Sequence, residues 1–255
     1  MTEVLGQPVS SRYSRNISLF GQDGQDILLD SKVLVVGAGG LGSPLLYYLA
    51  ANGIGTIGII DDDVVSLSDL QRQILYNTKM LHGDKVRHAK VVLENLNPDC
   101  NIITYQSLIQ DKTDIINDFD VIVECSDNFE TKFLLNHQCY FKHKPLVIGA
   151  AIGFEGYAGV FKPYHGKQNP CYKCFCHEIP EEADSLQSCA TQGILNATTG
   201  IIGSLQASMV IHELLQISSD LTGKLIRINL LKYSFRQSII TVNDKCTVCK
   251  NYSYT

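Results

Sequence analysis

The segment 32–44 constrains the fold of this chain more than any other. It opens with KVLVV, a valine-rich run typical of a buried strand. Gly37, Gly39 and Gly42 follow with the spacing G-x-G-x-x-G, and apolar residues at helical spacing come after them. This order predicts a strand, a tight turn and a helix whose N-terminus binds phosphate through free N–H groups and the positive end of its dipole.

Carboxylates follow the next predicted strand at 56–60. Asp61 stands directly after it, about where a dinucleotide-binding motif has its ribose-binding acid. Asp62 and Asp63 come next, and Asp69 lies a few residues further on. Ligands of open α/β sheets bind at the C-terminal ends of strands, so we expect a site here. A solvated acidic turn is the alternative interpretation, above all for Asp62.

Two further side chains point to the same site. Lys85 begins a predicted helix at 84–96, where a lysine gains nothing from the helix dipole. This favours a ligand for Lys85, with a plain surface lysine as the alternative. Asp127 follows a predicted strand at 120–124, so we expect it on the same rim as Asp61. Other expected elements are strands at 102–105, 146–148, 153–161, 225–230 and 238–242, and helices at 129–141 and 200–216.

Composition limits the class of protein. At 255 residues the chain is long enough for one large α/β unit. A net charge of −5 without a long basic run argues against non-specific nucleic-acid binding. There is no apolar run of about 18 residues and no signal-peptide pattern, so we expect no membrane association and a cytoplasmic location. Nine cysteines, an odd number, then indicate metal binding or chemistry rather than disulfides.

Four of these cysteines form two Cys-x-x-Cys pairs far apart in the chain. They are Cys171, Cys174, Cys246 and Cys249. Together they predict one zinc site with four thiolate ligands, which leaves no open position and is therefore structural. Reduced thiols or a redox pair are the alternative. Cys176 and His177 are second choices as ligands.

Taken together, these motifs resemble one family, the adenylyltransferases that activate ubiquitin-like sulfur-carrier proteins (the ThiF/MoeB/HesA family). The resemblance covers nearly the whole chain. The matching segments are RYSR at 12–15, GAGGLGS at 37–43, DDD at 61–63, LQRQ at 70–73, CSDN at 125–128, both cysteine pairs and GSLQA at 203–207. It implies a Rossmann-like, doubly wound, mainly parallel sheet that continues into an antiparallel region with the four-cysteine zinc site.

The resemblance also implies an activity. A homodimer would bind ATP and Mg²⁺, adenylate the C-terminal glycine of a carrier ending in Gly-Gly and release pyrophosphate. A sulfurtransferase or cysteine desulfurase would then supply sulfur. RYSR at 12–15, QILY at 73–76 and Gly153-Phe154 look closer to the thiamine branch than to the molybdopterin branch, which stays the alternative. One adenylation domain would span 1–255, with an arm at 1–30, a nucleotide-binding half at 31–150 and a carrier-binding and zinc half at 151–255.

Matching motifs assign roles to residues. Asp61 would hold the ribose, Arg72 and Lys85 would bind phosphates, Asp127 is the magnesium-linked aspartate, and Arg15 would reach the partner subunit's site. The residues implied in nucleotide and magnesium binding are Gly37, Gly39, Gly40, Gly42, Asp61, Asp63, Asp69, Arg72, Lys85, Asp127 and Asn128. The residues implied in catalysis are Arg15, Arg72, Lys85, Asp127 and Cys189, the last as a loop cysteine that some members link covalently during sulfur transfer.

Two positions depart from the family pattern. Asp69 stands where the family usually has asparagine, which places a negative charge near the triphosphate. Asn196-Ala197 stands where members often carry a proline-containing turn. Arg12 and Arg15, three residues apart in an amphipathic stretch, would share one face if that stretch is helical, although a solvated arm is the alternative.

The residues present suit adenylation without a histidine base. A carboxylate is already ionised near neutral pH, so the reaction needs positive charge rather than proton removal. Two other classes remain open. A nicotinamide-dependent dehydrogenase would share the glycine loop but not explain the cysteine pairs. A non-catalytic scaffold would explain Asp69, but not the presence of Arg15, Arg72, Lys85 and Asp127 together.

Overall fold

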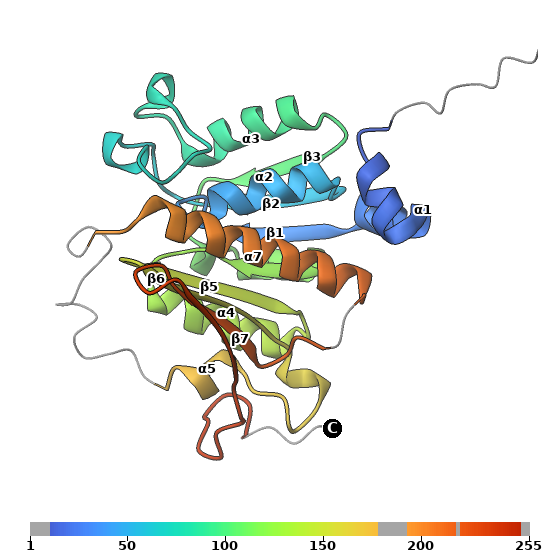
Figure 1. Ribbon diagram of the computed structural model, residues 1–255, viewed down its shortest axis with the longest axis vertical. Coiled ribbons are helices and arrows are strands. Elements are labelled where there is room, and N and C mark those ends of the chain that lie inside the picture. Colours follow the sequence, from blue (N-terminus) through green and yellow to red (C-terminus); the bar gives the residue numbers. More distant parts are fainter. Residues whose placement is uncertain (1–10, 178–192, 218–219, 251–255) are drawn as a thin grey trace, which may run out of the picture.

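The computed structural model describes residues 11–177, 193–217 and 220–250 (Figure 1). The strands are β1 (Lys32–Val36), β2 (Thr56–Ile60), β3 (Asn101–Tyr105), β4 (Val121–Glu124), β5 (Leu146–Ile152), β6 (Glu155–Phe161), β7 (Lys224–Asn229) and β8 (Ser234–Ile239). The α-helices are α1 (Ser14–Asp30), α2 (Gly42–Asn52), α3 (Lys85–Leu96), α4 (Phe129–Phe141), α5 (Tyr172–Phe175) and α7 (Asn196–Leu215). Short 3₁₀ helices are η1 (Leu67–Asp69), η2 (Thr78–Met80), η3 (Ile109–Asp118) and η4 (Pro163–His165).

One sheet joins all the described strands, in the order β3-β2-β1-β4-β5-β6-β7-β8. The first five in this order run parallel, and β6, β7 and β8 continue the sheet antiparallel. The order of the chain reverses between β1 and β4. In open α/β sheets this switch point is where a crevice opens at the C-terminal ends of the strands. The predicted Rossmann-like fold with an antiparallel continuation is confirmed.

Both faces of the parallel sheet are covered by helices. Val33 and Val35 of β1 pack into one apolar core and Leu34 and Val36 into the other, so the strand is apolar throughout. Helices α2, α3 and α7 lie over the first face, visible in Figure 1, and α4, η3 and α5 cover the second. Because helices cover both faces of the sheet, the crevice lies at the ends of the strands.

Several predicted boundaries shift. Helix α7 begins at Asn196 rather than near Gly200. The prediction placed the start too late because the first turn is polar in sequence, whereas the structure buries Thr198 and Thr199. Strand β8 spans Ser234–Ile239 rather than 238–242, since an exposed edge strand carries little hydrophobic alternation. Strand β5 runs on to Ile152, where it pairs with β6. No helix in the described parts of the chain has the length and apolar character needed to cross a membrane.

Candidate functional site

A cavity of about 590 Å³ opens at the switch point of the sheet. It brings together ten residues that the sequence places in nucleotide and magnesium binding, from the segments that follow β1, β2 and β4 and from the start of α3. These are Gly37, Gly39, Gly40, Asp61, Asp63, Asp69, Arg72, Lys85, Asp127 and Asn128. Gly42 is absent from the lining because it packs beneath the glycine loop, where a Cβ atom would lie 2.2 Å from the Gly37 carbonyl oxygen.

The glycines of the loop serve different purposes. Gly37 has φ +97°, and a Cβ there would approach the Cys125 backbone at 2.9 Å, so the chain itself requires glycine. At Gly39 the nearest atom to such a Cβ is Gln73 Nε2 at 3.6 Å, an ordinary contact. The protein alone therefore leaves room for a side chain at Gly39. Its absence keeps the backbone open to a ligand in the cavity.

Asp61 ties the end of β2 to the glycine loop. Its Oδ2 accepts a hydrogen bond from the Ala38 amide at 2.7 Å, and its Oδ1 accepts one from the Asp63 amide at 2.9 Å. Burial raises the pKa of Asp61, and the Ala38 N–H and the Lys85 charge oppose this effect. Each carboxylate oxygen keeps a further lone pair, so Asp61 retains the capacity to accept a ligand hydroxyl.

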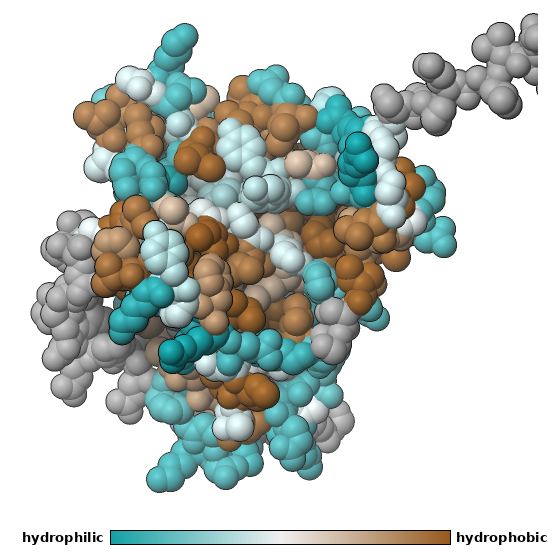
Figure 2. Space-filling view, in the orientation of Figure 1, coloured by the Kyte–Doolittle hydropathy of each residue, from teal (hydrophilic) through white to brown (hydrophobic). Residues whose placement is uncertain are grey.

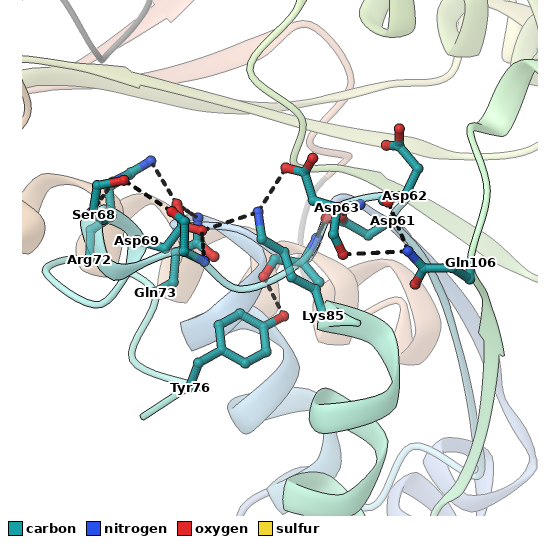
Figure 3. A network of polar contacts seen from close by, with 12 residues as sticks. Asp61, Asp62, Asp63, Ser68, Asp69, Arg72, Gln73, Tyr76, Lys85 and Gln106 are labelled. Atoms are coloured by element: carbon teal, nitrogen blue, oxygen red, sulfur yellow. Dashed lines mark hydrogen bonds and ion pairs between the residues drawn. The ribbon is translucent and has the colours of Figure 1, made fainter. Parts of the chain in front are cut away.

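Asp69 lies between two cations of the cavity, Arg72 and Lys85 (Figure 3). Its Oδ1 accepts a hydrogen bond from Gln73 Nε2 at 2.9 Å and lies 3.5 Å from Arg72 Nη2. Its Oδ2 caps η1 by accepting from the Ser66 amide at 3.0 Å, and lies 3.7 Å from Lys85 Nζ. The negative charge at this position is thus matched by Arg72 and Lys85.

Lys85 lies between two carboxylates, as Figure 3 shows, with Nζ 2.8 Å from Asp63 Oδ2. Only 4% of this residue is exposed. Burial opposes the ammonium charge, but the hydrogen bond to Asp63 and the charges of Asp61 and Asp69 outweigh it and raise the pKa of Lys85. The lysine is therefore fully charged at neutral pH, and a polyphosphate could replace its carboxylate partners.

The loop that carries Asp127 is held by a buried ion pair that sequence reasoning missed. Glu124 ends β4 and is fully buried, and its carboxylate bonds Lys132 of α4 and both the amide and hydroxyl of Ser126. Lys132 Nζ also donates to the Ser126 carbonyl at 2.8 Å. Gln206 of α7 donates to the Glu124 carbonyl at 2.8 Å. The sequence signal for this buried ion pair was a glutamate at the end of the otherwise apolar segment VIVE.

Asp127 and Asn128 differ in what their side chains do. Asp127 is exposed to the cavity, and its carboxylate makes no hydrogen bond or ion pair within the described residues. Asn128 Oδ1 accepts from the Thr131 amide at 2.8 Å and so caps α4. The Asp127 carboxylate is therefore available to a cation, whereas Asn128 has a structural partner.

Arg15 is the described member of the predicted catalytic set that lies outside the cavity lining. Arg15 is exposed in the first turn of α1 and does not line the cavity. Arg12 precedes that helix and bonds the Leu96 carbonyl and Asp99, so the condition for a shared helical face of Arg12 and Arg15 is not met. Cys189 lies outside the described residues.

The four predicted zinc ligands gather in one cluster, and none of them lines the cavity. Their sulfur atoms lie within 4.8 Å of one another, with Cys171–Cys246 at 3.6 Å and Cys174–Cys249 at 3.4 Å. Tetrahedral Zn–S bonds of about 2.3 Å would space sulfurs about 3.8 Å apart, so the cluster fits zinc. Thiol hydrogen bonds, chiefly from Cys171, lower the pKa of Cys174 and Cys246, and the same hydrogen bonds raise the pKa of Cys171.

The second-choice ligands are not part of this cluster. Cys176 packs against the second apolar core, and the exposed His177 ring contacts Asn243 and the Lys173 carbonyl.

The strands, the cavity residues and the four clustered cysteines all lie within a single family match. The model of the ThiF family matches residues 13–249. This chain belongs to the ThiF family.

Two relatives match this ThiF-family chain over almost all of both lengths. The SAMP-activating enzyme E1 of Haloferax volcanii is 38% identical over 98% of this chain and 92% of its own. The sulfur carrier protein adenylyltransferase of Thermus thermophilus is 37% identical over 93% of this chain and 90% of its own. Among solved structures, E. coli MccB with ATP has a TM-score of 0.80 at 25% identity, over 94% of this chain and 74% of MccB.

Proposed function

We propose that this chain is an adenylyltransferase that uses ATP to activate the C-terminal glycine of a ubiquitin-like sulfur carrier. One observation carries the proposal: the glycine loop, the cations Arg72 and Lys85, and the free carboxylate of Asp127 converge on one cavity at the switch point. The name of the Thermus relative and the ATP complex of MccB support the same chemistry. The adenylation domain would span the whole chain.

The cavity residues would divide the work as follows. The glycine loop and the start of α2 would receive the phosphates, and Asp61 would accept a ribose hydroxyl. Arg72 and Lys85 would exchange their carboxylate partners for phosphate oxygens. Asp127 would hold Mg²⁺, which supplies further charge neutralisation when bound. Asn128 would act by fixing the start of α4 next to Asp127.

The reaction needs no protein base. An oxygen of the carrier's C-terminal carboxylate, already ionised at neutral pH, attacks the α-phosphorus of ATP. The bond from that phosphorus to the bridging oxygen breaks, and its electron pair leaves with pyrophosphate. Two anions approach each other in this step, so the positive side chains at the cavity lower the barrier by stabilising the developing charge.

ATP–pyrophosphate exchange tests this proposal directly. With Mg²⁺ and a carrier ending in Gly-Gly, the protein should exchange labelled pyrophosphate into ATP, and Asp127→Ala should abolish the exchange. Asp114→Ala is the matched control, because Asp114 is exposed on η3 outside the cavity. Wild-type exchange by Asp127→Ala would remove Asp127 from the site. Reduction of NAD in place of exchange would favour the dehydrogenase alternative.

Arg15 enters the proposal through a homodimer. Its distance from the cavity within one chain suits a role in the partner subunit's site. Mixing Arg15→Ala with Asp127→Ala, each inactive alone, should restore exchange because a heterodimer would contain one complete site. An active monomer in solution would contradict this assembly.

The pathway assignment is thiamine biosynthesis, with the molybdopterin-synthase carrier as the alternative. It rests on the segments RYSR, QILY and Gly153-Phe154. We expect faster exchange with the thiamine-pathway carrier than with the molybdopterin-pathway carrier at equal concentrations. The opposite preference would assign the protein to the molybdopterin pathway and would not contradict the proposed adenylation.

A further inference from the structure

Two arginines face each other across neighbouring strands of the antiparallel region. The strand register places Tyr157 of β6 opposite Arg227 of β7, and Arg227 opposite Arg236 of β8. Residues directly opposite each other in a sheet project on the same face. Tyr157, Arg227 and Arg236 therefore form one row across three strands, called here the arginine row.

The arginine row leads from the edge of the sheet into the cavity. Tyr157 and Arg227 line the cavity, whereas Arg236 lies on the edge strand β8. The Arg227 guanidinium stacks 5.3 Å from the centre of the Phe175 ring. The Tyr157 hydroxyl bonds that of Tyr172 at 2.8 Å. These contacts hold the inner end of the row in place, since a guanidinium over an aromatic face is attracted to it.

The two charges of the arginine row have no counterion in the described parts of the chain. Like charges directly opposite on adjacent strands destabilise a sheet. Both arginines are exposed, and neither makes an ion pair within the described residues. The nearest carboxylate in the strand pattern is Glu155, one row away on the same face, and it accepts a hydrogen bond from Asn229 instead. Among the residues that the structure describes, the row thus has two cations without a carboxylate partner beside the mouth of the site.

We propose that the arginine row binds acidic side chains in the C-terminal tail of the carrier, upstream of its Gly-Gly end. This inference rests on the proposed function. The reacting glycine must enter the cavity, so the residues before it must cross the surface around its mouth, where Arg227 lies with Arg236 opposite it on the neighbouring strand. An extended tail spans about 3.3 Å per residue, so a few residues suffice to carry a carboxylate from the cavity to the row.

Binding of synthetic peptides to the full chain tests the arginine row. Two peptides ending in Gly-Gly differ only in carrying Glu or Gln at the third to fifth positions from the C-terminus. We expect the Glu peptide to bind about fivefold more tightly, which corresponds to the upper end of the range for an exposed ion pair. Arg227→Gln and Arg236→Gln should each reduce the ratio of the two dissociation constants. Raising the salt concentration should reduce it as well.

Lys232→Gln is the matched control, because it removes one exposed positive charge between β7 and β8 outside the row. It should leave the ratio unchanged. Arg236→Gln should also leave the melting temperature unchanged or raise it, since it relieves like-charge repulsion; a structural role would lower it. Equal binding of both peptides by the wild type, or an equal effect of Lys232→Gln, would overturn the inference.

Exchange assays separate this inference from the proposed function. Pyrophosphate exchange that proceeds equally with acidic and neutral tails would refute the role of the arginine row and leave adenylation standing. Absence of exchange with every carrier ending in Gly-Gly would refute adenylation itself. A preference in binding that the arginine variants do not reduce would place the acidic contact elsewhere on the protein and overturn the inference.

Discussion

Replacing Lys132 by methionine should leave the Glu124 carboxylate buried without its charged partner. In the wild type Glu124 is 0% exposed and Lys132 4% exposed, so neither charge is offset by water. The lysine also donates to the Ser126 carbonyl at 2.8 Å, on the loop that carries Asp127. The substitution therefore tests both the stability of this clamp and its part in positioning the loop.

The expected loss is about 3–5 kcal/mol, the usual cost of removing one partner from a buried ion pair. For a chain of 255 residues, an unfolding entropy of about 2.1 cal/mol/K per residue converts this loss into a fall in melting temperature of about 6–9 °C. Glu124→Gln combined with Lys132→Met should regain most of the loss, because no uncompensated charge then remains. The recovery measures the coupling between the two residues.

The loss of stability caused by Lys132→Met should depend on pH in a defined direction. Burial raises the pKa of Glu124, and the charge of Lys132 opposes this effect. In Lys132→Met the pKa rises further, so the folded state binds the proton more tightly than the unfolded state, whose pKa is near 4.5. The penalty is therefore absent below pH 4.5 and grows as the pH rises toward the folded-state pKa. The difference from wild type should shrink as the solution becomes acidic.

Thermal and urea unfolding of the wild type, both single variants and the double variant would measure these effects between neutral and acidic pH. Pyrophosphate exchange by the same proteins would report on the Asp127 loop, and we expect Lys132→Met to lower it even where the protein is fully folded. A melting temperature unchanged by Lys132→Met, or a double variant no more stable than that single variant, would refute the reasoning.

Four other outcomes follow from the site. Gly37→Ala should destabilise the protein, because the new Cβ would lie 2.9 Å from the Cys125 backbone and the residue has φ +97°. Gly39→Ala should leave the melting temperature nearly unchanged and raise the KM for ATP. An equal fall in melting temperature in both variants would contradict this contrast. Asp69→Asn should lower the KM for ATP, since it releases Arg72 and Lys85 from a carboxylate while keeping an acceptor oxygen; kinetics showing a higher KM would argue against it. Elemental analysis should find one zinc per chain, and Cys246→Ser should lose it together with several degrees of melting temperature; a zinc-free wild type with normal melting would exclude the site. Cys189→Ser should keep pyrophosphate exchange but slow thiocarboxylate formation when a sulfurtransferase supplies sulfur; mass spectrometry showing an undiminished rate would return the cysteine to a structural role.

Local sequence determined the elements around the nucleotide site. A β-branched run, three spaced glycines and an apolar helix leave one arrangement of the chain from β1 to α2, because each step follows from steric limits within a few residues. The acids after β2 and β4 then had to meet at one rim, since parallel strands end on the same side. Polar or exposed segments, such as the start of α7 and β8, gave no such signal.

Tertiary structure alone decided which side chains touch. Glu124 and Lys132 pair because the chain turns from β4 into α4, and Asp69 becomes a partner of two cations only when η1 meets the start of α3. The opposition of Arg227 and Arg236 depends on the register of β7 and β8, where a shift of one residue would send either side chain to the other face. Such contacts depend on packing between segments whose spacing no local pattern encodes.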